Sequence, residues 1–329
     1  MDGALMAGLK GELQQLDVVT FGESMALMYA EGDGRGLGSG RELAQSFGGA
    51  ESNLAIGLAR LGCRCGWFSM LGDDPMGRGI LKGIRGEGVD VSRAVKTKEA
   101  PTGLMLRESA RGKLSVYYYR SGSAASRMTP ELLDAEYIAN AGILHITGIT
   151  AALGSSCLDT VREAIRIAKQ AGVRISFDPN LRLKLWTVEQ ARPIIQELAQ
   201  SADYFLPGYD ELGLIYDTDD EETLLANVRR LPGMTVIKSA GNENWLVQGG
   251  ELHRRPFEHI NWLVDPVGAG DGFAAGFLAG ITKGLSPVEA LKLGSIVGSL
   301  VVQEPGDWEA LPLWSEVEAI LNRTGHIER

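Results

Sequence analysis

Short apolar runs alternate with longer helical repeats over most of this chain. Runs that suit buried strands occur at residues 142–146, 174–178, 204–206 and 235–238, and a helical pattern follows each of the first three. This alternation predicts an α/β fold with a mainly parallel sheet and right-handed crossovers. In such sheets ligands gather at the carboxyl ends of the strands, so the residues just beyond these runs are candidate site residues.

A different pattern marks a second, smaller sheet. Residues 102–107 and 113–120 alternate between apolar and polar positions and are separated by the turn-like stretch 108–112, which predicts a hairpin. Residues 27–29 form another short strand that would join it. Between them, residues 31–40 are rich in glycine. We interpret this stretch as a flexible loop beside the small sheet, with a phosphate-binding loop as the alternative.

The stretch 265–277, D-P-V-G-A-G-D-G-F-A-A-G-F, carries the clearest chemical signal. The apolar residues 262–264 before it suit the end of a buried strand. After it, Phe273, Phe277 and Ile281 recur on one face of a helix. The sequence therefore predicts a tight turn between a strand and a helix.

The residues of that turn are candidates for phosphate binding. Gly268, Ala269 and Gly270 would open the helix, where free backbone N–H groups and the helix dipole attract an anion. Asp271 follows directly and could face a reacting hydroxyl as a carboxylate that the helix N-terminus keeps ionised. The alternative is a plain loop in which Asp271 only caps the helix.

Two other nucleotide-binding patterns fit less well. Residues 270–275 match G-x-G-x-x-A, but the segment 287–302 reads as a helix where a dinucleotide-binding unit needs a second strand. No G-x-x-x-x-G-K-[ST] motif occurs in the sequence, which excludes a P-loop nucleotidase.

The composition of the chain limits the classes of partner that it can bind. The chain has 329 residues and a net charge of −10, which argues against nucleic acid or an anionic membrane as a partner. Three cysteines, without zinc-like spacing, suit a reducing cytosol. Residues 1–16 lack the apolar core of a signal peptide, and the apolar runs are too short to span a bilayer. We therefore expect a cytoplasmic protein.

Two runs carry a family resemblance. D-P-V-G-A-G-D-G-F at 265–273 and G-G-A-E-S-N-L-A-I-G-L-A-R-L-G at 48–62 resemble the two signatures of the ribokinase-like (phosphofructokinase-B type) sugar kinases. The resemblance extends from Val18 to Pro312. It implies ATP-dependent phosphorylation of a sugar hydroxyl with Mg²⁺, and an activating monovalent cation is the further cofactor that we consider. The catalytic residues it implies are Asp271 as the base, with Gly268, Ala269 and Gly270 as amide donors.

The resemblance also implies a three-layer α/β/α domain with a small β-sheet lid over the sugar. Family lids often form the contact between subunits, so we expect a homodimer or a higher homo-oligomer. The predicted division is a main domain at 17–24, 48–98 and 122–329, a lid at 25–47 and 99–121, and an N-terminal extension at 1–16.

The substrate side resembles the 2-keto-3-deoxygluconate kinases. Leu27 stands where many sugar kinases carry an Asp that binds sugar hydroxyls. Tyr118 and Arg120 share one face of a lid strand, and Arg182 follows a strand end. Two arginines suit a carboxylate. The expected substrate-binding residues are Gly48, Gly49, Asn53, Met105, Tyr118, Arg120, Arg182 and Asp271; Met105 departs from the Tyr that is usual in those kinases.

The same resemblance implies a nucleotide site and a metal site. Glu211 is expected to hold Mg²⁺ through water, although Gly208 replaces the Asn of the family motif. The loop 306–312 is expected around the adenine. The expected ATP-binding residues are Lys238, Ser239, Gly241, Gly268, Gly270, Ser295 and Gly298.

These expectations define one function and two alternatives. The expected reaction is phosphorylation of the terminal hydroxyl of 2-keto-3-deoxygluconate, giving 2-keto-3-deoxy-6-phosphogluconate. A fructokinase, or another ketose or sugar-acid kinase, is the alternative within the family. A catalytically silent sugar-binding regulator is the alternative from another class.

Overall fold

The computed structural model describes residues 15–30, 37, 42–110, 113–258, 260 and 262–322. Three predictions fall wholly or partly outside these residues: the N-terminal extension, most of the glycine-rich stretch 31–40, and the tip of the hairpin at 111–112. The division into a main domain and a lid at the stated boundaries remains a prediction.

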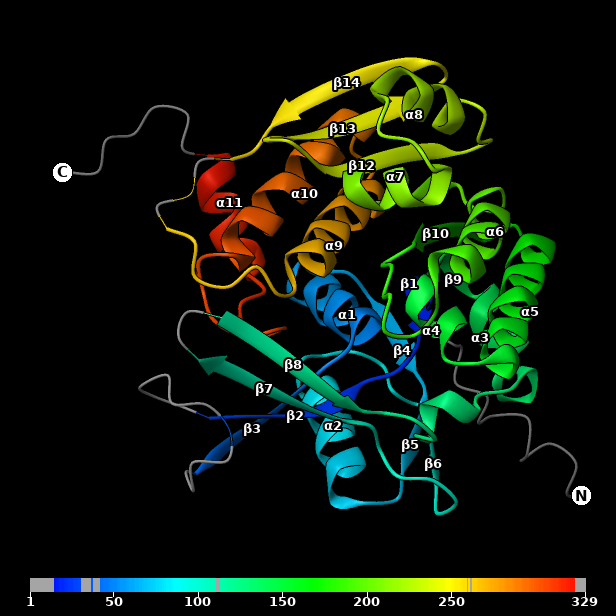
Figure 1. Cartoon of the computed structure of the whole chain (residues 1–329), viewed down its shortest axis with the longest axis vertical. Coiled ribbons are helices and arrows are strands. Elements are labelled where there is room, and N and C mark those ends of the chain that lie inside the picture. The colour runs from blue at the N-terminus through cyan, green and yellow to red at the C-terminus, as the bar shows by residue number, and fades with distance from the viewer. Residues whose placement is uncertain are drawn as a thin grey trace, which may run out of the picture.

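An eight-stranded, mainly parallel sheet forms the centre of the molecule (Figure 1). Six strands run parallel, and β13 and β14 add an antiparallel hairpin at one edge. The interior strands are buried along most of their length, as expected for a parallel sheet covered on both faces. In order across the sheet the strands are β14 (Glu251–Pro256), β13 (Glu243–Gln248), β12 (Met234–Ala240), β11 (Tyr204–Phe205), β10 (Arg174–Asp178), β9 (Ala141–Thr147), β1 (Leu16–Phe21) and β4 (Cys65–Phe68).

Helices cover both faces of this sheet and bury two hydrophobic cores (Figure 1). One face carries α3 (Ala135–Ala139), α5 (Ser155–Ala171), α6 (Val188–Ala199), α7 (Tyr209–Tyr216) and α8 (Glu221–Val228). The other carries α1 (Ala50–Arg60), α2 (Pro75–Gly86), α9 (Ala269–Thr282), α10 (Pro287–Val301) and α11 (Trp314–Leu321). The short α4 (Gly148–Ala152) follows β9. The predicted three-layer α/β/α architecture is therefore confirmed.

The smaller sheet is also confirmed. It has four strands in the order β3 (Leu43–Gly48), β2 (Met25–Ala30), β7 (Leu104–Ala110) and β8 (Lys113–Tyr119). The predicted hairpin is β7–β8, and the sheet lies beside α1 at one end of the larger sheet (Figure 1). Two further short strands, β5 (Met70–Gly72) and β6 (Val95–Thr97), pair with each other. We call the four-stranded sheet the lid.

One predicted strand is wrong. Residues 262–264 form no strand, and their side chains are 50–65% exposed. The Val264 N–H donates to the carbonyl of Val302 (2.8 Å), so this apolar run lies along the end of α10. The strand before it in the chain is instead the antiparallel edge strand β14. Among the described residues, no helix is long and apolar enough to cross a membrane.

Candidate active site

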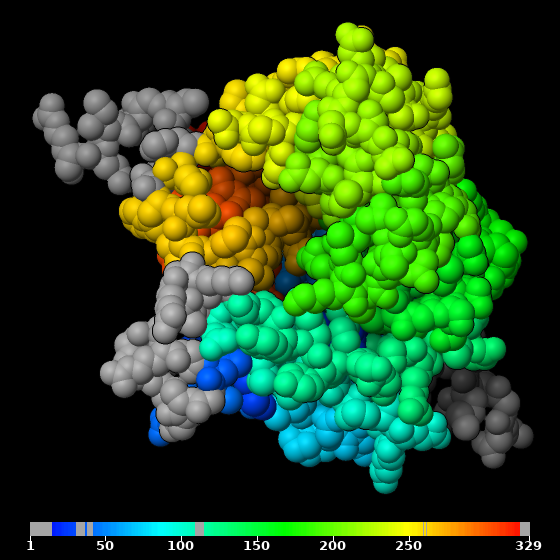
Figure 2. Space-filling model, viewed as in Figure 1, coloured from blue at the N-terminus to red at the C-terminus, as the bar shows by residue number. Residues whose placement is uncertain are grey.

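Two pockets meet where the carboxyl ends of the central strands face the lid. The first is a polar cavity of about 400 Å³ between the lid, the loops after β10 and β12, and the start of α9. The second is a mostly apolar cavity of about 340 Å³ between α9, α10 and the loop after β14. Lys238, Ser239 and Gly270 line both cavities. The surface in Figure 2 is hollowed where the gold, green and teal segments meet.

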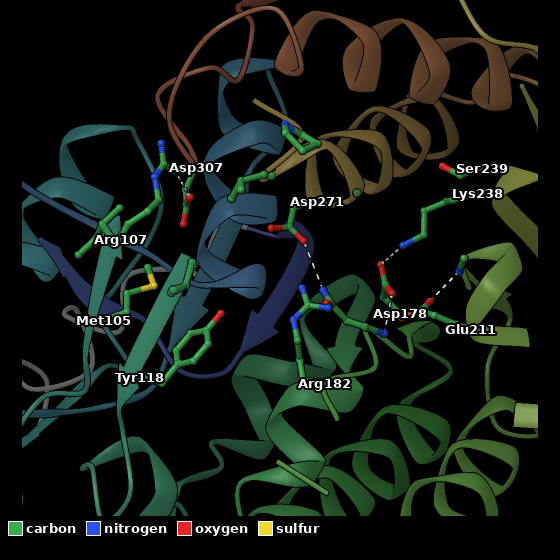
Figure 3. A pocket seen from close by; sticks show the side chains of 18 residues that line it. Met105, Arg107, Tyr118, Asp178, Arg182, Glu211, Lys238, Ser239, Asp271 and Asp307 are labelled. Carbon is green, nitrogen blue, oxygen red and sulfur yellow. Dashed lines mark hydrogen bonds and ion pairs between the residues drawn. The ribbon is translucent and has the colours of Figure 1, made fainter. Parts of the chain in front are cut away.

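Asp271 lies in the first turn of α9 and lines the polar cavity. The amide Nδ2 of Asn53 donates to its Oδ2 (2.9 Å), and that of Asn180 approaches its Oδ1 (3.5 Å; Figure 3). Burial raises the pKa of Asp271 to about 6, although the Asn53 hydrogen bond, Arg182 and Lys238 each oppose this shift. The helix N-terminus therefore does not keep the pKa of Asp271 at its ordinary value. Asp271 is nonetheless mostly ionised at pH 7 and is able to accept a proton.

The turn before Asp271 has the geometry of an anion site. Gly268 has φ +76°, and a Cβ there would lie 2.3 Å from the carbonyl oxygen of Asp307, so only glycine fits. The N–H groups of Gly270 and Asp271 have no helical acceptor, and no other acceptor is recorded for them among the described residues. The Ala269 N–H instead donates to the carbonyl of Pro266 (3.3 Å). Of the three amides predicted as donors, that of Gly270 is thus left for an anion and that of Ala269 is engaged within the turn. The N–H of Asp271, which was not among the predicted donors, joins that of Gly270.

Opposite this turn, a lysine is held by carboxylates. Nζ of Lys238 pairs with Oδ2 of Asp178 (2.5 Å), which lies at the end of β10. Burial alone would lower the pKa of Lys238, but Asp178, Glu211 and Asp271 outweigh it and raise that pKa. Lys238 is therefore a fixed positive charge at the junction of the two cavities.

Glu211 lies in the first turn of α7 and lines the polar cavity. Its Oε1 accepts the Leu181 N–H (2.6 Å) and its Oε2 accepts the Gly208 N–H (2.7 Å). These bonds fix the carboxylate, and each oxygen keeps a lone pair that can accept from a metal-bound water. Within the described part of the chain, no group of three or more His, Cys, Asp or Glu side chains could hold a metal ion. The residues present therefore fit a Mg²⁺ bound mainly through water and phosphate oxygens.

The two predicted substrate arginines lie in different environments. Arg182 lines the polar cavity below Asp271, with Tyr118 of the lid beside it (Figure 3). Its only recorded hydrogen bond within the described residues goes to the carbonyl of Leu181 (3.4 Å). Arg120 instead pairs with the fully buried carboxylate of Glu23 (2.5 Å) and lines a neighbouring groove. Of the two arginines, Arg182 is thus the one for which the described residues supply no ion-pair partner.

The lid closes the polar cavity with apolar and aromatic side chains. Leu27 and Met105 form its floor together with Met25, which lies behind them. Leu27, which stands where the family resemblance implies an Asp, thus lines the polar cavity. Met105, which replaces a Tyr, adds a second apolar contact instead of a hydroxyl.

The motif at the start of α1 contributes to the site in two ways, through the side chain of Asn53 and through the close packing of its glycines. Gly48 and Gly49 do not line the cavity, but a Cβ at Gly48 would lie 2.0 Å from Oδ2 of Asp307. Asp307 is itself a buried carboxylate that lines the polar cavity and that the sequence analysis did not select. Burial raises its pKa to about 7, against the opposing effect of Arg107. Nothing in its loop sequence signals this role, because the loop belongs to no periodic element.

The apolar cavity suits a planar base. Ser295 and Gly298 of α10 line it, together with Phe273 of α9. The Asn244 amide donates to the hydroxyl of Ser295 (3.0 Å), which fixes one wall. Gly241 lies in the β12–β13 turn outside the lining, and no described residue of the loop 306–312 lines this cavity. Asp307 of that loop lines the polar cavity, and the placement of the loop around the adenine stays a prediction.

A polar cavity with a buried carboxylate, next to an anion-binding helix start and an apolar cavity, defines a phosphoryl-transfer enzyme on a ribokinase-like fold. The family profile described as pfkB family carbohydrate kinase matches residues 15–314, and the chain belongs to this family. It is 40% identical to the 2-dehydro-3-deoxygluconokinase of Bacillus subtilis (strain 168), over 95% of this chain and 98% of that protein. It is 33% identical to the 2-dehydro-3-deoxygluconokinase of Thermoproteus tenax, over 96% and 94% of the two chains. Among solved structures, a PfkB protein from Polaromonas sp. JS666 shares 36% identity with a TM-score of 0.84, covering 92% of this chain and 99% of that one.

Proposed function

We propose that this carbohydrate kinase transfers the terminal phosphoryl group of ATP to the terminal hydroxyl of 2-keto-3-deoxygluconate. The observation that carries the proposal is the junction of the two cavities, where Asp271 and the open helix start lie between a sugar-sized polar space and an apolar space. The relatives named 2-dehydro-3-deoxygluconokinase support the choice of substrate. The product is 2-keto-3-deoxy-6-phosphogluconate.

The sugar-acid assignment rests on charge. An acidic protein with net charge −10 repels an anionic substrate unless a local cation attracts it. Arg182 supplies that charge at the cavity, and Tyr118 adds a hydroxyl from the lid. The planar guanidinium of Arg182 is suited to bind the substrate carboxylate with two hydrogen bonds.

In the proposed reaction Asp271 accepts the proton of the substrate hydroxyl as the oxygen attacks phosphorus. Transfer of a phosphoryl group depends mainly on positioning and on neutralising charge. The N–H groups of Gly270 and Asp271 donate to the transferring group, and Lys238 offsets its negative charge. Ser295, Gly298 and Phe273 hold the adenine in the apolar cavity.

Magnesium completes the proposed site. Glu211 would hold the ion through one of its waters, and the ion would supply neutralisation of the charge on the nucleotide phosphates. An activating monovalent cation, to which no residue is assigned, is tested by comparing turnover in potassium chloride and in tetramethylammonium chloride.

We further propose a cytoplasmic enzyme that assembles through its lid. Three free, buried cysteines suit a reducing compartment. The lid strand β8 is an edge strand that exposes Tyr117, Tyr118 and Tyr119, a surface that a second subunit could cover.

A coupled assay of ADP release tests the function against its alternatives. The panel contains 2-keto-3-deoxygluconate, its C4 epimer, fructose and ribose, each with ATP and Mg²⁺, and the variant Asp271→Asn is the control. The proposal requires the highest kcat/KM with a 2-keto-3-deoxy sugar acid. A preference for fructose would indicate a fructokinase. Binding of a sugar without ADP release from any of them would indicate a silent regulator.

A further inference from the structure

An arginine of the lid connects two loops of the main sheet that the reaction needs. Arg107 projects from β7 into the polar cavity, and its side chain is only 15% exposed (Figure 3). One terminal nitrogen, Nη2, pairs with Oδ2 of Asp265 (2.8 Å). The other, Nη1, donates to Oδ1 of Asp307 (3.4 Å). Both terminal nitrogens of Arg107 are therefore paired with carboxylates of the protein.

Each carboxylate is tied to the anion-binding turn. Oδ1 of Asp265 accepts the N–H of Val267 (3.0 Å), the residue before Gly268. The carbonyl oxygen of Asp307 lies 2.3 Å from the position that a Cβ of Gly268 would take, so the two loops touch at the turn itself. A change in the position of Arg107 is thus transmitted to the turn through both loops.

The loop that carries Asp307 is held from its other side. Nη1 of Arg60 in α1 donates to the carbonyls of Trp308 (3.2 Å) and Leu311 (2.5 Å). Asp265 is held through its own N–H, which donates to the carbonyl of Val302. With both loops anchored to the main layers, Arg107 joins each of them to the lid through an ion pair. Ser46 of β3 adds a hydrogen bond from the lid to the carboxylate of Glu309 in the Asp307 loop.

We propose that Arg107 is a positioning residue for phosphoryl transfer, which holds the anion-binding turn and the Asp307 loop in the reacting geometry when the lid covers the sugar. This inference deepens the proposed function and rests on it. Arg107 acts through Asp265 and Asp307. It does not bind the substrate carboxylate, because its terminal nitrogens Nη1 and Nη2 are already paired with these two carboxylates. The lid would then order the phosphate site as well as cover the sugar.

Three variants test the proposal. Arg107→Met keeps an apolar stem but removes the charge, Asp265→Asn removes its partner, and Arg107→Met/Asp265→Asn removes both. Arg107→Lys is the conservative variant. Arg78→Met is the matched control, since Arg78 is a largely exposed arginine whose ion pair with Asp73 is 3.7 Å long.

Turnover and hydrogen exchange give the two readouts. Arg107→Met should lower kcat about tenfold or more and speed exchange in the peptide 262–272, because misplacement of a site by about 1 Å already costs large factors in rate. Arg107→Lys should restore part of the turnover and part of the protection of the peptide from exchange. The double variant should regain part of the Tm that Arg107→Met loses, since no unpaired carboxylate remains at 265 while Asp307 still lacks its partner, and it should not regain turnover.

Other results overturn the proposal. An increase in the KM for the sugar alone, with kcat and exchange of the turn unchanged, would make Arg107 a substrate contact. Recovery of turnover in the double variant would show that the ion pair matters only for folding. If Arg107→Met does not fold, Arg107→Lys and Asp265→Asn carry the same comparison. The exchange experiment uses the protein without substrate, so it remains decisive even if the wild type proves inactive on every sugar of the panel.

Discussion

Replacing Arg182 by alanine should reduce activity on a sugar acid while leaving the fold intact. Arg182 has no ion pair among the described residues. Its removal therefore leaves no carboxylate without a counter-ion. A hydrogen bond to a charged group contributes about 1.5–3 kcal/mol, which corresponds to about one to two decades in kcat/KM. Because Arg182 is exposed at the cavity, solvent screening favours the lower end, about tenfold.

Arg120 provides the matched comparison. Its guanidinium pairs with Glu23, whose side chain is 0% exposed, so Arg120→Ala leaves a buried carboxylate without its counter-ion. Breaking a buried pair in this way costs about 3–5 kcal/mol of stability. Arg120→Ala should therefore lower Tm by several degrees, whereas Arg182→Ala should not change it measurably.

The assay measures kcat/KM for 2-keto-3-deoxygluconate, fructose and ATP in the wild type and both variants. In Arg182→Ala the value for the acid should fall, while those for fructose and ATP should barely change, since neither loses a carboxylate contact. A wild type that prefers fructose would refute the reasoning. An equal loss for both sugars in Arg182→Ala would show that the arginine acts only on the structure.

Four further predictions test the site and the assembly. Asp271→Asn should lose turnover by about 10²-fold or more while isothermal titration still detects both substrates, and wild-type turnover in the folded variant would exclude Asp271 as the base. Since Asp271 must be ionised and its pKa is raised to about 6, kcat/KM of the wild type should be flat above that pH and fall about tenfold per unit below it; a profile flat down to pH 5 would contradict this. Gly268→Ala should lose about 1–3 kcal/mol in urea unfolding, because φ is +76° and the new Cβ meets the Asp307 carbonyl. Sedimentation should show a dimer or larger species, and a stable monomer at assay concentrations would argue against assembly through the lid.

The sequence alone was sufficient for the elements whose signal is local. The strand β10 has the predicted bounds, and α9 begins directly after Gly268, because apolar periodicity and turn glycines act over a few neighbouring residues. The places of Lys238 and Glu211 in the polar cavity could also be predicted, since carboxyl ends of parallel strands share one edge of the sheet. Asp271 reaches the same cavity from a turn that no parallel strand precedes. The residues 262–264 show the limit of that reasoning, because an apolar run is the same in a strand and along a cavity wall.

The tertiary structure decided which charges are free. Arg120 and Arg182 look alike in the sequence, but only the fold brings Glu23 against Arg120, from a segment far away in the chain. Arg107 and Asp307 were missed for the same reason, since their pairing joins a lid strand to a loop near the C-terminal end. The pKa of Asp271 likewise depends on burial, which outweighs the helix N-terminus once the lid and the surrounding loops exclude water. Charge and protonation depend on neighbours in space, and a sequence lists only neighbours along the chain.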